Sequence, residues 1–178
     1  MDVFTEKLKH GSSEAFEKLV KDYKARIFSI SMGMLGNRED ALDATQEVFI
    51  KIFRSIHSFK GDSALSTWIF RITKNVCIDT LRKNKAVFED EIPETLADTS
   101  LPTPEEALML SQKRDLVKNC IKELPLNYKT VLLLREYEGM SYSEIAETLE
   151  ISEGTVKSRI SRAREYLFKL LKTKKELL

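Results

Sequence analysis

Apolar residues recur at intervals of three and four along most of this chain, which is the spacing of one face of an α-helix. The first stripe of this kind runs through Phe16, Leu19, Tyr23, Ile27 and Ile30. Two further long stripes follow before residue 84, and four helical segments follow after residue 104. The pattern therefore predicts an all-α fold.

Three long helices are expected in the N-terminal part, over residues 12–33, 37–55 and 67–83. Gly33 and Gly36 mark the end of the first, because glycine favours turns. Asn37 begins the second helix, and Ser66 is a suitable N-cap for the third. The second helix is expected to bury an apolar arc that consists of Ala41, Leu42, Val48, Phe49, Ile52, Phe53 and Ile56.

The opposite side of this second helix carries an apolar residue among polar ones. Ile50 shares that face with Asp43, Gln46 and Glu47. An apolar centre with a polar rim is typical of protein interfaces. A single exposed isoleucine on a solvated face is the alternative interpretation.

A polar loop with small residues, 58–66, leads into the third helix and has Phe59 and Trp68 near its ends. Aromatic side chains beside a basic helix suit single-stranded nucleic acid, because unpaired bases stack and phosphates need cations. Trp68 can equally be a core anchor, with the loop a plain connection. The expected outward side of the third helix carries Arg71, Lys74, Asn75 and Arg82.

Residues 84–104 break the helical pattern. They include three of the four prolines and the acidic run at 89–91. This composition is typical of a flexible linker. Fully extended, the segment spans about 70 Å. The sequence thus predicts two small helical domains, 1–83 and 105–178, joined by the acidic linker 84–104.

The C-terminal part contains a helix-turn-helix pattern at 139–171. Ser141 and Glu144 form a capping box for the first of its two helices, and Ser152 caps the second. Glu150 lies in the turn, at a position that tends towards positive φ. A side chain there costs about 1 kcal/mol of strain.

The second of these helices has an apolar stripe of Val156, Ile160, Ala163 and Leu167. Its opposite face carries short hydroxyls and arginine, which suit base edges in a DNA major groove, while flanking cations suit phosphates. The alternative is an ordinary helical hairpin with solvated charges. The candidate DNA-contacting residues are Thr155, Lys157, Ser158, Arg159, Ser161, Arg162 and Arg164.

Composition adds few constraints. The net charge is +1, so DNA affinity must come from local patches and not from the whole chain. The chain shows no signal peptide and no apolar run of membrane-spanning length, which makes the cytoplasm the expected compartment. Cys77 and Cys120 are isolated and are expected to be buried thiols. We find no catalytic constellation, metal cluster or phosphate loop, so no enzyme activity, metal or cofactor is expected.

Three blocks of this sequence resemble bacterial RNA polymerase sigma factors of the extracytoplasmic-function (ECF) group. They are DALDATQEVFIKIF at 40–53, FKGDSALSTWIFRITKNVCIDTLRK at 59–83, and LPLNYKTVLLLREYEGMSYSEIAETLEISEGTVKSRISRAREYL at 124–167. The order of the blocks and the acidic linker between them also match that group.

The resemblance implies a transcription initiation factor that carries no bond chemistry of its own. It implies that the surface formed by Asp40, Asp43, Gln46, Glu47 and Ile50 binds core RNA polymerase. It implies that the second helix of the helix-turn-helix reads the −35 promoter element. It also implies that an anti-sigma protein covers the polymerase-binding face. The residues implied in recognising and opening the −10 element are Lys60, Gly61, Asp62, Ser63, Ala64, Leu65, Trp68, Arg71, Lys74, Asn75 and Arg82.

Two other classes of function remain as alternatives. A two-domain helix-turn-helix regulator predicts a sensory pocket or phospho-acceptor cluster in residues 1–83. An enzyme acting on nucleic acid predicts an acid–base or metal constellation. The sequence shows neither feature.

Overall fold

The computed structural model describes residues 2–87 and 116–175, and in this part of the chain the elements are helices joined by turns and loops, without strands. The predicted all-α fold is thereby confirmed. Most of the predicted linker lies outside the described residues. The elements are α1 (Val3–Lys9), α2 (Ser13–Leu35), α3 (Arg38–Ser55), the 3-10 turn η1 (Ile56–Ser58), α4 (Leu65–Val87), a helical segment over 116–123, α6 (Leu126–Glu136), α7 (Tyr142–Leu149) and α8 (Glu153–Lys175).

Side-chain caps set the ends of the long N-terminal helices, as the sequence predicts. Ser12 Oγ accepts a hydrogen bond from the Ala15 amide at 3.3 Å, and Asn37 Oδ1 accepts one from the Asp40 amide at 2.8 Å. Gly36 ends α2 in the left-handed region, at φ 84°. Each cap satisfies a backbone group that has no partner inside its helix.

Several predicted boundaries are wrong. The sequence analysis missed α1, whose N-cap is Asp2. Helix α2 does not end at Gly33 but runs on to Leu35. Helix α4 begins two residues before Thr67 and continues past Lys83 to Val87. Helix ends are the features that local sequence signals place least precisely.

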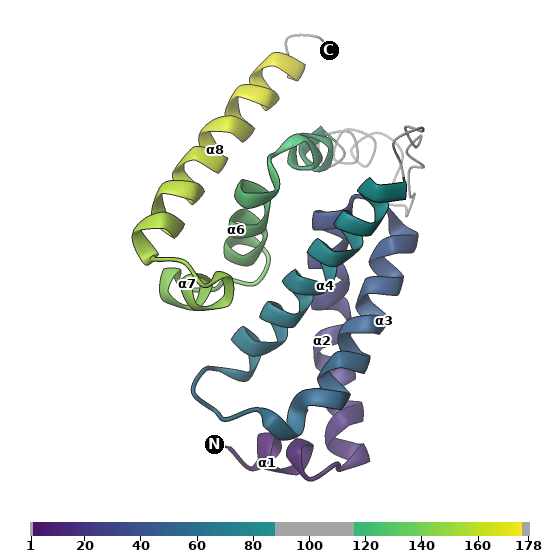
Figure 1. Ribbon diagram of the computed structural model, residues 1–178. Coiled ribbons are helices and arrows are strands. Elements are labelled where there is room, and N and C mark those ends of the chain that lie inside the picture. The colour runs from purple at the N-terminus through teal and green to yellow at the C-terminus, as the bar shows by residue number, and fades with distance from the viewer. Residues whose placement is uncertain (1, 88–115, 176–178) are drawn as a thin grey trace, which may run out of the picture.

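The N-terminal core lies between α2, α3 and α4, which pack against one another along their lengths (Figure 1). Its fully buried side chains include Leu19, Ile27, Val48, Ile52 and Ile69. This arrangement uses one face of α3 only.

Two members of the apolar arc predicted for α3 are not in this core. Leu42 is 47% exposed and Phe53 is 62% exposed. The Phe53 ring packs on Phe16 in a T-shaped arrangement, with centroids 5.2 Å apart. The prediction was too wide because α2 and α4 both pack on the same side of α3.

In the C-terminal part, α6 and α7 pack against α8, and Val131, Leu134, Ile145 and Ile160 are buried among them. Tyr137, just after α6, and Val117, in the segment 116–123, are exposed.

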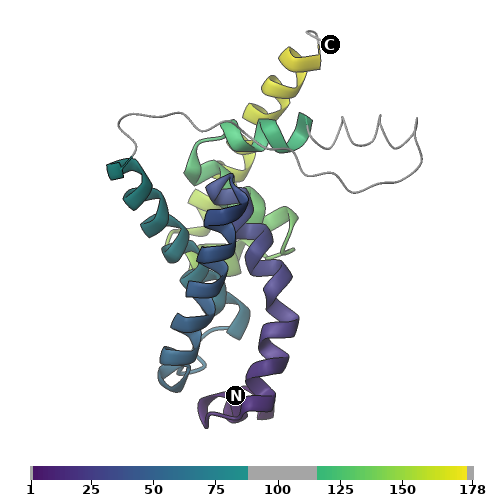
Figure 2. The same cartoon turned by 90° about the vertical axis from the view of Figure 1, so that its right-hand side faces the viewer.

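The two parts of the chain lie against each other. Helix α6 packs on α2, and α7 packs on α4, so that α8 is on the side of the molecule away from α3 (Figures 1 and 2). One continuous cluster of buried residues runs from Leu19 and Ile27 to Leu133 and Ile145. The sequence analysis did not anticipate this shared core.

Candidate nucleic-acid and protein interfaces

The helix-turn-helix is built by the caps that the sequence predicts. The Glu144 amide donates to Ser141 Oγ at 3.2 Å, and the Ser141 amide donates to Glu144 Oε2 at 2.8 Å, which completes the capping box. The hydrogen bond from the Ser141 amide lowers the pKa of Glu144. Ser152 Oγ accepts from the Thr155 amide at 3.1 Å and so caps α8.

Glu150 forms the turn between α7 and α8 in the left-handed region, at φ 57° and ψ 45°. Among the described residues it is the only non-glycine residue with positive φ. The left-handed conformation expected at this position is therefore present in the structure.

Burial on one side fixes the rotation of α8. Val156, Ile160 and Ala163 are buried against α6 and α7. Ser158, Ser161, Arg162 and Lys157 are exposed, and Thr155 and Arg159 are half-buried. The outward face is thus the one that the sequence pattern predicts. Its contact with DNA remains a prediction.

Arg164 already has a carboxylate partner, as do Lys169 and Lys174 of the same helix. Its Nη2 donates to Glu136 Oε1 at 2.7 Å, and this hydrogen bond raises the pKa of Arg164. The pair ties α8 to the last turn of α6. A phosphate would have to compete with Glu136 for this guanidinium.

The outward face of α3 is more apolar than the sequence analysis predicts. Ile50 is 38% exposed and lies beside exposed Gln46. At about 100° per residue, Leu42, Gln46, Ile50 and Phe53 fall within roughly 80° of one another. This wheel position could have revealed Leu42 and Phe53 as surface residues. We call these four residues the α3 apolar face.

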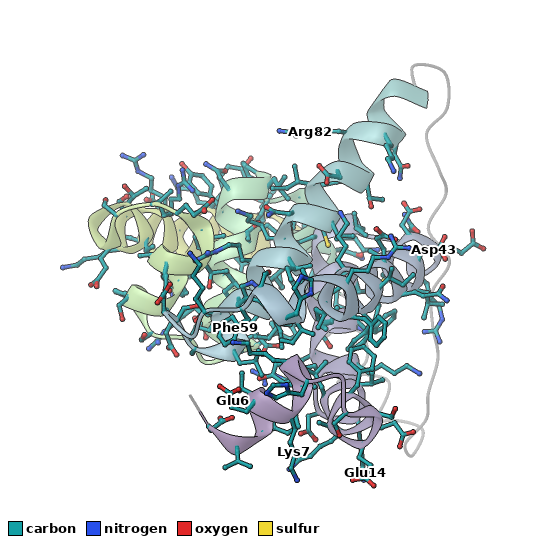
Figure 3. The ribbon with its side chains drawn as sticks, turned by 60° about the horizontal axis from the view of Figure 1, so that its bottom comes forward. Glu6, Lys7, Glu14, Asp43, Phe59 and Arg82 are labelled. Atoms are coloured by element: carbon teal, nitrogen blue, oxygen red, sulfur yellow. The ribbon has the colours of Figure 1, made fainter. Side chains whose placement is uncertain are left out.

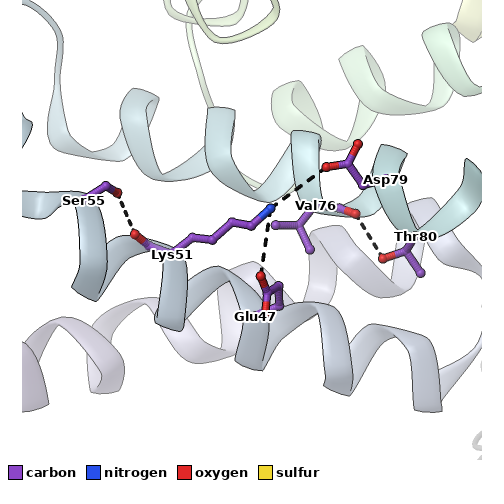
Figure 4. Close-up of polar contacts among 6 residues, drawn as sticks. All are labelled: Glu47, Lys51, Ser55, Val76, Asp79 and Thr80. Carbon is purple, nitrogen blue, oxygen red and sulfur yellow. Dashed lines mark hydrogen bonds and ion pairs between the residues drawn. The ribbon is translucent and has the colours of Figure 1, made fainter. Parts of the chain in front are cut away.

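Acidic residues border the α3 apolar face. Asp43 and Glu47 are exposed, and Asp43 points away from the packed helices (Figure 3). Lys51 Nζ lies 4.0 Å from both Glu47 Oε1 and Asp79 Oδ2, which links α3 to α4 (Figure 4). Asp40 is different, because it accepts hydrogen bonds from Asn37 at 2.7 Å and Asn84 at 2.6 Å.

The loop before α4 offers fewer aromatic surfaces than the sequence suggests. Phe59 is only 6% exposed, and its ring packs on Trp68 with centroids 5.4 Å apart. Phe59 cannot stack on a base in this arrangement, so that expectation is wrong. Trp68 is half-buried, in agreement with a partial core role. The exposed residues of the loop are Lys60, Gly61, Asp62 and Ala64, while Ser63 and Leu65 are half-buried.

The basic side of α4 divides into an open part and a covered part. Asn75 and Arg82 are exposed, and Arg82 projects from the free end of α4 (Figure 3). Lys74 is half-buried. Arg71 Nη2 donates to the Glu147 carbonyl of α7 at 3.0 Å, and its Nε is buried without a hydrogen-bond partner.

Within the described residues no cluster of His, Cys, Asp and Glu is arranged to hold a metal ion. No helix in the same part of the chain is long and apolar enough to cross a membrane. Cys77 is buried beside Ser31, and burial raises its pKa to about 11, while Cys120 is also buried. Both cysteines are thus the buried thiols that the sequence predicts.

Comparison with known families matches both parts of the chain. The family model of sigma-70 region 2 matches residues 19–87, and that of sigma-70 region 4 matches residues 114–167. The first match includes α3 and α4, and the second includes the helix-turn-helix.

Relatives match over almost the full length. The ECF RNA polymerase sigma factor SigW of Bacillus subtilis is 37% identical over 176 residues, which cover 93% of each chain. The ECF RNA polymerase sigma-E factor of Haemophilus influenzae is 36% identical over 171 residues, or 91% of this chain and 90% of the relative. The chain belongs to the ECF group of bacterial RNA polymerase sigma factors, and it is a promoter-directing transcription initiation factor.

Solved structures show the same fold. The sigma factor RpoE of Bartonella quintana, crystallised with the anti-sigma factor NepR, has 25% sequence identity and a TM-score of 0.74 over 88% of this chain and 96% of that one. CnrH, solved with the cytosolic domain of CnrY, has 23% identity and a TM-score of 0.72 over 96% of each chain.

The strain at Glu150 is testable by substitution. Glu150→Gly should raise the free energy of unfolding by about 1 kcal/mol, because glycine has no Cβ to oppose the left-handed conformation. The measurement is urea denaturation followed by circular dichroism. Glu165→Gly, inside α8, is the control and should lower stability by about 1 kcal/mol. A loss of stability in Glu150→Gly would contradict the assignment of strain.

Proposed function

We propose that this chain binds core RNA polymerase through the α3 apolar face and its acidic border. The loop 59–68 and the basic side of α4 contact the −10 element, and the outward face of α8 reads the −35 element. The observation that carries the proposal is the outward face of α8, where Ser158, Ser161 and Arg162 stand opposite a buried stripe. Such a helix can enter a major groove with its base-reading side chains forward.

In this function the chain supplies recognition and the polymerase supplies chemistry. Base-edge contacts from α8 and stacking or phosphate contacts from the α4 region bring the polymerase to a start site. The chain itself performs no bond-breaking step. It acts in the cytoplasm, where the polymerase and the promoter DNA are.

An anti-sigma protein is the further partner that fits this chain. The relative from Bartonella quintana was solved with an anti-sigma factor bound. In our chain the α3 apolar face exposes Leu42, Ile50 and Phe53 to solvent. A regulator that covers these side chains would bury apolar area and block the polymerase at the same time.

Run-off transcription with purified core polymerase tests the proposed function. We expect the chain to direct transcripts from a subset of genomic promoter fragments that core enzyme alone does not use. Failure to produce any promoter-dependent transcript across a genomic library would overturn the proposal.

The α3 apolar face has a direct test at its centre. Ile50→Arg should weaken binding to core polymerase by roughly 2 kcal/mol or more, because it places a charge at the middle of the interface. The measurement is competition with a labelled reference sigma factor for limiting core enzyme. Val3→Arg, which changes an exposed apolar residue on α1, should compete like the unchanged chain. Normal competition by folded Ile50→Arg would show that the interface lies elsewhere.

Base readout and phosphate contact can be separated on α8. Arg162→Ala should relax the preference at one base pair of the −35 element, since a bidentate contact to guanine discriminates by about 1–3 kcal/mol. Lys157→Ala should weaken binding to all promoters by about the same factor. It should also lower the slope of log affinity against log salt concentration by about one unit. Arg164→Ala should lower this salt slope by less, because Glu136 already neutralises the Arg164 guanidinium.

The measurement for these three variants is holoenzyme binding to a library of −35 substitutions at two or more salt concentrations. If Arg162→Ala reduces binding to every site by the same factor, the groove-facing side of α8 is misassigned.

A further inference from the structure

Gly154 is the one glycine of this chain whose presence the fold does not explain. Gly33 is required by packing, because a Cβ there would lie 2.7 Å from Leu133 Cδ1 of α6. Gly154 has no such neighbour, since the nearest atom to a Cβ at this position is Ser152 Oγ, 3.8 Å away, and its φ is not positive. The other four of the six glycines lie at positive φ, which favours glycine, and they are Gly11, Gly36, Gly61 and Gly139.

Glycine at position 154 works against helix formation. Gly154 is the second residue of α8, and it is exposed. Within a helix, glycine is less favourable than alanine, because its backbone loses more conformational freedom on folding. A methyl group has room at this position, so alanine would fit the folded chain and stabilise α8. The reason for the glycine therefore lies outside the free chain.

The place of Gly154 on α8 relates it to the residues proposed to read DNA. Ser158 and Ser161 follow it at i+4 and i+7, so at about 100° per residue the three positions fall within roughly 60° of one another. Lys157 and Arg162 lie on either side of them, roughly 60° and 80° from Gly154. All five residues are exposed. The middle of the outward face of α8 thus carries only short side chains, with long cations at its borders.

Short side chains reach bases only when the helix backbone lies close to the DNA. The serine hydroxyl is one bond beyond Cβ, whereas an arginine guanidinium extends much further. Ser158 Oγ donates to the Thr155 carbonyl at 2.9 Å, which leaves its oxygen able to accept a hydrogen bond from a base. The N-terminal residues of a recognition helix are the ones that contact base edges. A side chain at position 154, one turn before Ser158 on the same face, would therefore meet the DNA first and hold the helix away from it.

We propose that Gly154 sets the depth at which α8 enters the major groove of the −35 element, so that Ser158 and Ser161 reach base edges. Gly154 is a positioning residue, because it supplies no side-chain contact and acts by leaving the volume of a Cβ free for DNA. The inference rests on the proposed function of α8 and adds a division of labour to it. The two serines depend on the close approach, and the longer Arg162 depends on it less.

Gly154→Ala and Gly154→Leu test this role, because both new residues favour a helix more than glycine does. Thermal unfolding of the free chain, followed by circular dichroism, reports stability. Holoenzyme binding to a library of −35 substitutions reports affinity and base preference, and competition for limiting core polymerase reports assembly. Thr173→Leu is the matched control, because it adds apolar bulk at an exposed position of α8 about 28 Å further along the helix axis.

Gly154→Ala should raise the melting temperature by about 1–3 °C and should compete normally for core polymerase. It should weaken binding to the preferred −35 sequence roughly tenfold, as for the loss of one base contact, and Gly154→Leu should weaken it roughly a hundredfold. Thr173→Leu should bind like the unchanged chain.

A double-mutant comparison separates depth from a general loss of binding. Ser158→Ala should relax the preference at one base pair in the unchanged chain. The same substitution should have little further effect in Gly154→Ala, because the serine hydroxyl no longer reaches the base there.

Full affinity of Gly154→Ala for the −35 element, or equal effects of Ser158→Ala in the two backgrounds, would overturn the role of Gly154. A lower melting temperature of Gly154→Ala would overturn it as well, because the glycine would then serve the fold. If the unchanged holoenzyme shows no −35 preference, the proposed function of α8 fails together with this inference. A −35 preference that Gly154→Ala retains in full removes the inference alone.

Discussion

A helix can read DNA only if the rest of the protein holds its rotation, and burial of Val156, Ile160 and Ala163 imposes that rotation on α8. Because these three side chains are enclosed by α6 and α7, the hydroxyls and arginines on the opposite side cannot turn inward. The capping box of α7 and the left-handed turn at Glu150 set the angle at which α8 leaves that core. The Arg164–Glu136 pair adds a polar tie on the flank.

The same packing that orients α8 also brings the two parts of the chain together. Helices α6 and α7 have one side on α8 and another on α2 and α4, so they take part in both contacts. Glu138 and Leu133 belong to the contact with α2, while Leu132 and Ala163 form a second buried cluster on the far side. A helical unit this small can bury only a limited apolar area, so nearly all of its apolar faces pack against other helices. The α3 apolar face is a conspicuous exception among the described helices.

The features that the sequence predicts well are local ones. The capping box of Ser141 and Glu144, the caps at Ser12 and Asn37, and the inward stripe of α8 all depend on residues within one or two helical turns. The resemblance to ECF sigma factors, confirmed by the family matches, rests on blocks of such local patterns.

The features that the sequence misses depend on residues far apart in the chain. The glycine at position 33 resembles a helix end in the sequence, and its partner Leu133 lies a hundred positions away. The sequence gives no sign that Arg71 has a partner, because the carbonyl that accepts its hydrogen bond belongs to α7, far along the chain. The arc of buried residues predicted for α3 is too wide, because the sequence does not show from which side α2 and α4 pack on this helix. Relative placement of helices is decided by side-chain shape at the contact, which periodicity does not contain.

The central claim is that one chain contacts two separated promoter elements through α8 and the loop before α4. Photocrosslinking of a holoenzyme–promoter complex measures this directly, with a crosslinking side chain at Ser161 in one preparation and at Lys60 in another. The account predicts two labelled positions on the same promoter about 25 base pairs apart, near −35 for Ser161 and near −10 for Lys60, which is more than two turns of DNA. Crosslinks from both positions within a single turn, or none from Ser161 near −35, would contradict it.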